Sequence, residues 1–191
     1  MYLEALKAIP PVREEDDHRE EGRHRARAVN VFIETPTGSR DKFDLNHDTG
    51  LLEWSLQLPL GLSFPFAFGF VPNTLADDGD ALDICLLVDG VIPPGTIVPS
   101  RLIGVLTVSQ DESGDGETDT RNDRILAVPT LAQSYGDVDD VHELRDGFYE
   151  EVARFFERYN QLIDRAFDFG EPGDRDEAYR RLDQAVERAA S

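Results

Sequence analysis

Apolar residues on alternate positions begin the ordered part of the chain near Val29. Val29, Val31 and Ile33 follow this two-residue period, which is typical of a half-buried strand. Spacers rich in Gly, Pro and Asp separate further apolar stretches, and no helical patterns of roughly 10–15 residues lie between them. The sequence therefore predicts an antiparallel barrel or sandwich rather than a βαβ sheet. The further strands are expected at residues 41–45, 51–56, 66–71, 82–88, 97–108 and 125–128.

The apolar period changes to that of a helix near the C-terminal end. Apolar side chains at spacings of three, four and seven share one helical face between Leu144 and Ala166. Gly170, Pro172 and Gly173 interrupt the pattern, and Asp174 can cap a second helix. We expect an α+β fold that is mainly β, with helices at its C-terminal end. The second helix would carry Ala178, Leu182, Ala185 and Val186 on its apolar side.

Residues 1–28 differ in composition from the rest of the chain. Arg, Glu, Asp and His dominate Val12–Ala28, and no apolar stripe follows Pro10 and Pro11. A solvated arm and a partly helical arm both fit this pattern, and we favour the solvated arm. The interpretation is a charged N-terminal arm over 1–28 and a single domain over 29–191.

The charge narrows the range of partners. Lys and Arg number 19 against 39 Asp and Glu, a formal net charge of −20. Nucleic acid and anionic membranes need a basic footprint, so neither is an expected partner. An anionic substrate would be repelled as well, unless bound cations reverse the local sign. Acidic surfaces are also common in proteins adapted to high salt, and that explanation of the charge stays open.

Two further features of the sequence bear on the cellular compartment of the protein. No apolar run approaches the ~20 residues that cross a bilayer, and the first 28 residues hold no apolar signal-peptide region, so we expect a cytoplasmic protein. Cys85 is the only cysteine. It lies in an apolar stretch, where the role of a small buried hydrophobic residue is expected.

The segment Asp77-Asp78-Gly79-Asp80-Ala81-Leu82-Asp83 carries the clearest chemical signal. If a strand begins near Ala81, Asp83 heads a row that continues with Cys85 and Leu87. A carboxylate on such an apolar row is costly unless a cation or a donor meets it. Gly79 allows a turn through which Asp78 and Asp80 can converge on Asp83. Three hard oxygen donors within six residues suit Mg²⁺, which keeps several waters and leaves room for phosphate oxygens.

Two alternatives compete for this segment. Asp and Gly are turn formers, so an isolated D-G-D triplet is more often an acidic turn. An EF-hand needs an oxygen ligand at loop position five, Gly at six and Glu at twelve. Counted from Asp78, these positions hold Leu82, Asp83 and Asp89, so the EF-hand fails.

The segment resembles the D-x-D-x-x-D signature of the soluble, family I inorganic pyrophosphatases, and its surroundings extend the match over roughly Val29 to Gly170. The resemblance implies a five-stranded, OB-like closed barrel flanked by helices. It also implies hydrolysis of pyrophosphate by a metal-activated water, with several Mg²⁺ ions in the site. The matching segments are F-P-x-x-F-G-F-V-P-x-T-L at 64–75, P-P-G at 93–95, G-V-L at 104–106, I-L-A-V-P at 125–129 and F-F-x-x-Y at 155–159.

The family's site residues transfer by position. Asp80 would be the general base that accepts a proton from a metal-bound water, a role for which an aspartate within hydrogen-bond reach suffices. Metal ligands would be Asp78, Asp83, Asp111 and Asp123, with Glu34 acting through water. Lys42, Arg124 and Tyr159 would bind phosphate or substrate, and Asp44 would neighbour Lys42.

Four positions depart from the family pattern. Leu56 stands where many members carry an arginine, Phe68 where a tyrosine is expected, and Asn160 where a lysine is expected. Asn122 occupies the place of a metal-binding aspartate, and Asp123 is one residue displaced, so it should face the other side of its strand unless a bulge intervenes. The segments R-N-D-R and G-S-R-x-K resemble a divergent branch of the family whose members are assigned the same activity.

Three functions follow as hypotheses. The first is an Mg²⁺-dependent inorganic pyrophosphatase, a member of a family that is commonly homo-oligomeric. The second keeps the metal site but acts on another phosphoanhydride or a phosphate ester, because Leu56 and Asn160 remove cations. The third is a non-catalytic regulator that binds metal or phosphate on the same barrel.

Overall fold

The computed structural model describes residues 2–13, 27–111, 119–161 and 166–191. Five of its strands close into a barrel: β2 (Ala28–Thr35), β5 (Ala67–Phe70), β6 (Asp83–Leu86), β10 (Arg124–Pro129) and β7 (Ile97–Leu106), which pairs back onto β2. The mainly β fold with a closed five-stranded barrel is confirmed. The pairing differs from the expected antiparallel order at one place, because β6 and β10 run parallel. The chain passes through β7 and the two strands after it before returning beside β6, which permits this parallel pair.

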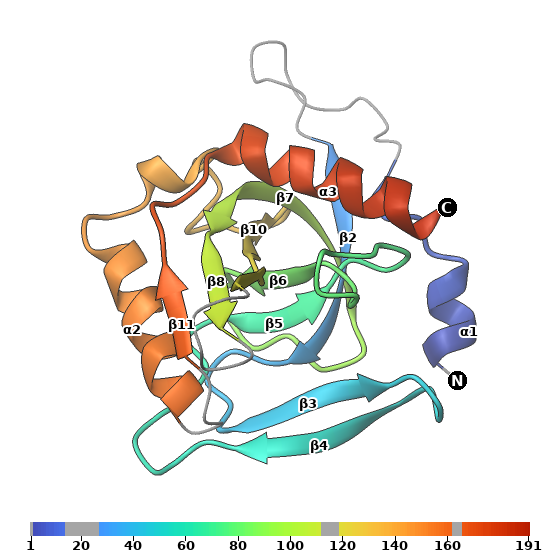
Figure 1. Cartoon of the computed structure of the whole chain (residues 1–191), viewed down its shortest axis with the longest axis horizontal. Helices are drawn as coiled ribbons and strands as arrows, with labels where there is room; N and C mark the ends of the chain where they lie inside the picture. Colours follow the sequence, from blue (N-terminus) through green and yellow to red (C-terminus); the bar gives the residue numbers. More distant parts are fainter. Residues whose placement is uncertain (1, 14–26, 112–118, 162–165) are drawn as a thin grey trace.

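Shorter elements surround the barrel (Figure 1). The hairpin of β3 (Asp41–Asn46) and β4 (Leu51–Gln57) lies along one side, and a second small sheet joins β8 (Val108–Asp111), β9 (Asp119–Arg121) and β11 (Ala166–Phe169). The helical elements are α1 (Tyr2–Lys7), a 3₁₀ turn η1 (Val141–Glu143), α2 (Phe148–Gln161) and α3 (Arg175–Ala189). No helix in these described ranges has the length and apolar character needed to cross a membrane.

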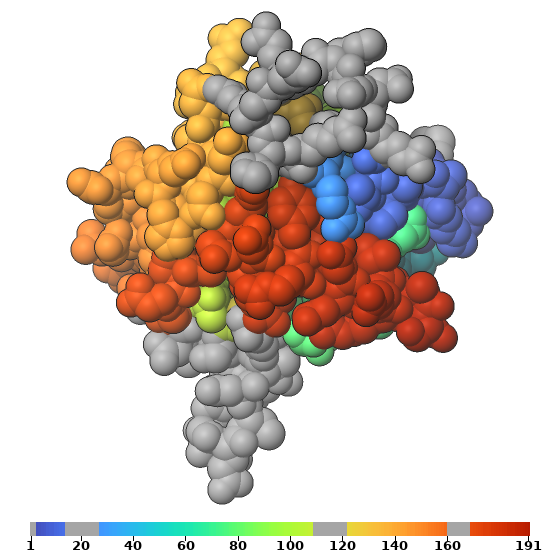
Figure 2. Space-filling model, turned by 90° about the horizontal axis from the view of Figure 1, so that it is seen from above, coloured from blue at the N-terminus to red at the C-terminus, as the bar shows by residue number. Residues whose placement is uncertain are grey.

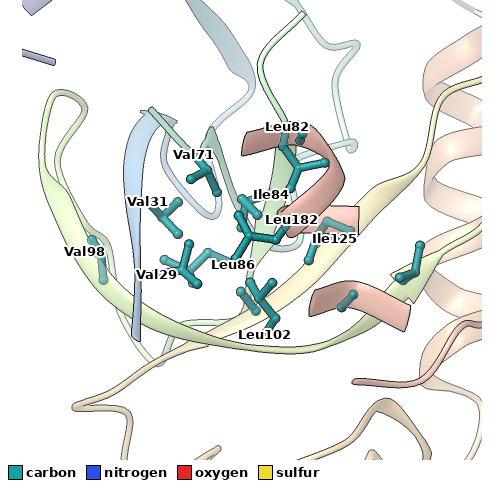
Figure 3. Packing of buried hydrophobic residues seen from close by; sticks show 14 of the residues in the cluster. Val29, Val31, Val71, Leu82, Ile84, Leu86, Val98, Leu102, Ile125 and Leu182 are labelled. Carbon is teal, nitrogen blue, oxygen red and sulfur yellow. The ribbon is translucent and has the colours of Figure 1, made fainter. Parts of the chain in front are cut away.

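Helix α3 covers the apolar interior of the barrel. Asp174 caps it as predicted, its side chain accepting the Glu177 N–H at 2.8 Å. Ala178, Leu182 and Ala185 are fully buried against the barrel interior. In Figure 3, Leu182 lies among Leu86, Ile84 and Leu102. The helix therefore completes the barrel core, and its other side carries polar residues that face the acidic loop.

A second core lies on the outer face of the barrel, beneath α2. The two-residue period of β6 separates Ile84 and Leu86, which point inward, from Cys85, which packs outward with Phe66 and Phe156. Asp83 begins this strand on the same side as Cys85, as predicted. Cys85 is fully buried, in agreement with the expected packing role. The outer core thus lies on the same side of β6 as Asp83.

Gly69 marks a close approach between β5 and β2. A Cβ at this position would lie 1.9 Å from the Phe32 carbonyl oxygen, so only glycine fits. The register between the strands shifts here: Ile33 pairs with Gly69, and Thr35 pairs with Phe68. Glu34 is the extra residue of this bulge, and bulges turn side chains in new directions.

The expectation of a solvated arm over 1–28 requires correction for residues 2–13. Leu6 of α1 is buried with Phe32 and Phe70, and β1 (Val12–Arg13) pairs with β2. Asn73 donates to the Leu6 and Ile9 carbonyls at 3.1 and 2.8 Å, which provides partners at the end of α1. The apolar residues before Pro10 are few, but they meet an apolar patch on the outside of β2. Residues 14–26 lie outside the described residues.

Leu6 tests this contact. Leu6→Ala should lower the free energy of unfolding by about 2–3 kcal/mol, because it removes a buried side chain and leaves a cavity. Urea unfolding followed by fluorescence gives the measurement. Leu60→Ala is the matched control, since Leu60 is 88% exposed. Equal stability of the two variants would show that α1 does not belong to the core.

Candidate metal and phosphate site

The acidic loop between β5 and β6 is folded by its own hydrogen bonds. The Thr74 hydroxyl donates to the Val71 carbonyl at 2.6 Å and accepts the Leu82 N–H at 2.9 Å. The Ala76 N–H donates to the Asp80 carbonyl at 2.7 Å. Gly79 lies between the two signature aspartates with φ of +89°, a conformation that side chains rarely adopt. The D-G-D segment is thus a tight turn, and Asp78 Oδ1 accepts the Asp80 N–H at 3.2 Å within it.

Asp83 stands where this loop enters the barrel. Its Oδ2 lies 3.3 Å from Arg124 Nε, which comes from the start of the parallel neighbour β10. Burial raises the pKa of Asp83, Arg124 opposes this rise, and the negative charges of Asp78 and Asp80 add to it. Electrostatic interaction thus links Asp83 with Asp78 and Asp80, and the convergence of the three carboxylates on one metal ion stays a prediction.

Glu34 reaches the same region from the bulge in β2. Its Oε1 accepts the Leu45 N–H at 2.7 Å. Burial is the main reason that the pKa of Glu34 rises to about 8, and the charges of Asp44 and Asp83 contribute to the rise. A cation that neutralised the neighbouring carboxylates would lower the pKa of Glu34 and stabilise its charged form.

Lys42 provides positive charge beside these acids. Its ammonium group pairs with Asp44 on the same strand. Burial lowers the pKa of Lys42, but electrostatic interactions with Tyr159, Asp44 and Glu34 outweigh it and raise the pKa overall. Lys42 is therefore held in its charged form, within electrostatic reach of the Tyr159 hydroxyl.

Tyr159 projects from α2 through the aromatic cluster. Its ring centroid lies 5.9 Å from that of Phe64 and 6.1 Å from that of Phe155. The ring is held by packing, as an apolar helical stripe predicts, while the hydroxyl end meets Lys42 electrostatically. The packing and substrate-contact interpretations of Tyr159 are thus compatible.

Seven of the nine predicted site residues form one electrostatic network: Glu34, Lys42, Asp78, Asp80, Asp83, Arg124 and Tyr159. Within the described residues, no three His, Cys, Asp or Glu side chains are close enough together to enclose a metal ion. The donor set nevertheless fits a hard divalent cation, because it offers carboxylate oxygens whose mutual repulsion such an ion would relieve.

Asp123 lines the same pocket as Asp78 and Asp83 but is oriented by contacts of its own. Its Oδ1 accepts the Val108 N–H at 3.1 Å, and its Oδ2 lies 3.6 Å from Arg181 Nε. Asn122 and Asp123 lie between β9 and β10 and line one pocket, so the expected opposite facing of Asp123 is not seen. Asn122 lines the same pocket as Asp78 and Asp83, and its side-chain oxygen accepts from Arg124. Asp111 ends β8, and its side chain lies outside the described part of the structure.

Two arginines of α3 near the site were not predicted from the sequence. Arg181 lines the pocket with Asp123. Arg188 Nη2 lies 2.5 Å from Oδ1 of Asp77, the residue directly before the signature. Their separation of seven residues places both on one side of a helix. Only this spacing signals a shared surface, and it does not reveal what the surface faces.

The departures from the family pattern lie next to the network. Leu56 pairs directly across the hairpin from Lys42, so the missing arginine would have stood beside that lysine. The Phe68 ring packs 5.5 Å from Phe64 and 5.7 Å from Phe156, which keeps the aromatic contact without a hydroxyl. Asn160 belongs to α2, but its side chain is outside the described residues.

Comparison with known proteins gives a consistent result. The family model described as inorganic pyrophosphatase matches residues 31–190. An inorganic pyrophosphatase of Saccharolobus solfataricus is 31% identical over 163 residues, which cover 84% of this chain and 91% of that protein. One from Aquifex pyrophilus is 33% identical over 170 residues, covering 87% and 88%. The crystal structure of the Thermus thermophilus inorganic pyrophosphatase superposes with a TM-score of 0.81 at 26% identity, over 97% of this chain and 99% of that chain.

The barrel, the acidic turn and the neighbouring basic side chains are typical of metal-dependent enzymes that act on phosphate compounds. The chain belongs to the inorganic pyrophosphatase family. This membership confirms the predicted resemblance, and it implies a divalent metal cofactor.

Glu34 gives a pH-dependent prediction. The folded protein holds a proton on Glu34 up to about pH 8, whereas the unfolded chain releases it near pH 4.5. In EDTA, stability should therefore fall as pH rises through this window, by up to a few kcal/mol. Glu34→Gln keeps the acceptor for Leu45 N–H and should flatten the fall. Urea unfolding at pH 5, 7 and 9 tests this, and an equally steep profile in both proteins would contradict it.

Proposed function

We propose that this chain hydrolyses inorganic pyrophosphate to two phosphates with Mg²⁺ as its cofactor. The observation that supports this most strongly is the gathering of Asp78, Asp80 and Asp83 next to Lys42 and Arg124 in a member of the inorganic pyrophosphatase family. Carboxylates suited to a hard cation and cations suited to phosphate thus share one site. Homo-oligomerisation and a cytoplasmic location stay predictions.

Asp78 and Asp83 are the proposed metal ligands, and Glu34 acts through water. When bound, Mg²⁺ supplies charge neutralisation and lowers the pKa of coordinated water. Asp80 is exposed at the turn and accepts the proton from the attacking water. The turn fixes its position, because the Asp80 main chain bonds to both Ala76 and Asp78.

Lys42, Arg124 and Tyr159 are the proposed substrate contacts. Arg124 remains anchored to Asp83 and to the Asn122 carbonyl at 2.7 Å, so its planar group is held for bidentate contact with phosphate oxygens. Lys42 contributes a compact charge, and Tyr159 a hydroxyl at the edge of the aromatic cluster. Asp111 stays a predicted ligand. Asp123 also stays a predicted ligand, because it lines the same pocket as Asp78 and Asp83 while it contacts Val108 and Arg181.

Asp80→Asn tests the catalytic assignment. The variant should lose about 10²–10⁴-fold in phosphate release from pyrophosphate, because the amide cannot accept the proton. Phosphate release is measured colorimetrically with Mg²⁺ and with excess EDTA, and EDTA should abolish it in the unaltered protein. Asp48→Asn, which removes a charge from an exposed hairpin turn, should keep full activity. Full activity of Asp80→Asn would refute the role of Asp80.

A second candidate function is supported by Leu56. An apolar residue opposite Lys42 leaves one fewer cation for the second phosphate, so an organic phosphoanhydride or ester is an alternative substrate. A panel of phosphoanhydrides and phosphate esters measures the preference. A preference for one of these over pyrophosphate would favour this second function.

Leu56→Arg tests the same position from the other side. The variant should lower the KM for pyrophosphate by about tenfold, since a hydrogen bond to a charged group is worth ~1.5–3 kcal/mol. Leu51→Arg is the control, because Leu51 is an exposed residue at the far end of the same strand. An unchanged KM would show that position 56 does not contact the substrate.

A further inference from the structure

Helix α3 runs beside the acidic loop as well as over the barrel. Figure 1 shows the loop between β5 and β6 next to the C-terminal half of α3, and Figure 2 shows α3 on the surface above green atoms of that part of the chain. The Leu75 N–H donates to the Ala185 carbonyl at 2.9 Å. The loop is therefore attached to the helix by its main chain immediately before the signature begins.

Arg188 adds a side-chain attachment at the same place. Its Nη2 lies 2.5 Å from Asp77 Oδ1, and its Nη1 donates to the Leu75 carbonyl at 3.4 Å. Both the arginine and the aspartate are partly exposed, at 39% and 42%. One guanidinium group thus spans the two ends of the segment 75–77, directly before Asp78.

Arg181, which shares one helical face with Arg188, makes a similar contact with another acidic residue of the same pocket. It lies between Asp123 and Glu177, at 3.6 and 2.5 Å. Asp123 stands between Asn122 and Arg124, so its fixed position helps to define where Arg124 meets Asp83. The two α3 arginines therefore hold the residues adjacent to the proposed site rather than the site residues themselves.

This arrangement divides the acidic residues into two groups. Asp77 and Asp123 are paired with α3, whereas Asp78 and Asp80 form no ion pair with any basic residue of the described ranges. Pairing Asp77 removes a like charge next to Asp78 and fixes the entry to the turn. Within the described residues, Asp78 and Asp80 are thus left for metal binding and proton transfer, while Asp83, the other proposed ligand, is paired with Arg124.

We propose that Arg188 is a positioning residue: through Asp77 it anchors the acidic loop on α3 so that Asp78 and Asp80 are presented for metal binding. This inference rests on the proposed function and extends it to a helix outside the signature. We assign Arg188 a positioning role because its ion pair and hydrogen bond are with Asp77 and the Leu75 carbonyl, although it also lines the pocket that Asp78 and Asp83 line.

Five variants separate the anchor from a general effect of charge. Arg188→Gln and Asp77→Asn each remove one partner, and the double variant completes a mutant cycle. Arg188→Lys keeps the charge and serves as the conservative replacement. Arg180→Gln is the matched control, because Arg180 lies on the same helix but pairs only with Glu177 in the described structure.

Two measurements apply to each variant. Amide hydrogen exchange in EDTA reports the order of the loop at Leu75, Ala76 and Gly79, whose N–H groups are hydrogen-bonded. Isothermal titration with Mg²⁺ reports the affinity of the metal site. We expect loop exchange about two- to fivefold faster and Mg²⁺ affinity weaker by a similar factor in Arg188→Gln and Asp77→Asn. The double variant should show no further loss, Arg188→Lys should recover part of it, and Arg180→Gln should match the unaltered protein.

Unchanged exchange and affinity in Arg188→Gln would overturn the proposal. Faster exchange with unchanged Mg²⁺ affinity would also overturn it, because the arginine would then be a structural tie only. Since exchange is measured in EDTA, it tests the anchor even if the unaltered protein releases no phosphate. A lack of phosphate release by the unaltered protein would refute the proposed function and not the anchor.

Discussion

Carboxylates that meet at the edge of a barrel repel one another, and the geometry of this protein is arranged around that repulsion. Asp78, Asp80 and Asp83 each add negative potential at one place, and burial strengthens the effect at Asp83. Arg124 offsets part of it from the neighbouring strand. Under the proposed function, the remaining negative charge would attract a divalent cation, and that cation would let a chain of net charge −20 hold an anionic substrate.

The barrel makes this concentration of charge possible because its two packed faces hold the strands in place. The inner face is sealed by Leu182 of α3, and the outer face by the aromatic cluster beneath α2. Asp83 and Arg124 start parallel neighbouring strands, so their separation is fixed by the main-chain pairing. The bulge at Glu34 directs a fourth carboxyl to the same side. Rigid strands thus hold Asp83, Arg124 and Glu34, while the turn around Gly79 holds the two remaining aspartates.

Local patterns predicted most of this arrangement. The period of two along residues 82–88 assigned Cys85 and Ile84 to opposite faces, because strand geometry leaves no other choice. Asp174 was recognisable as a helix cap from its position alone. The role of residues 2–13 was not predictable, since Leu6 becomes buried only when it meets the outside of β2. The partners of Asp123 and Arg188 were equally hidden, because the α3 contacts join residues more than fifty positions apart.

The most direct test of the account is a titration of metal-free protein with Mg²⁺, comparing the unaltered chain with the Asp78→Asn/Asp83→Asn double variant by calorimetry. If clustered carboxylates supply the binding energy, the unaltered protein gives a saturable heat of binding that the double variant loses. Equal binding by the two proteins would contradict the account, because the cation would then be held elsewhere.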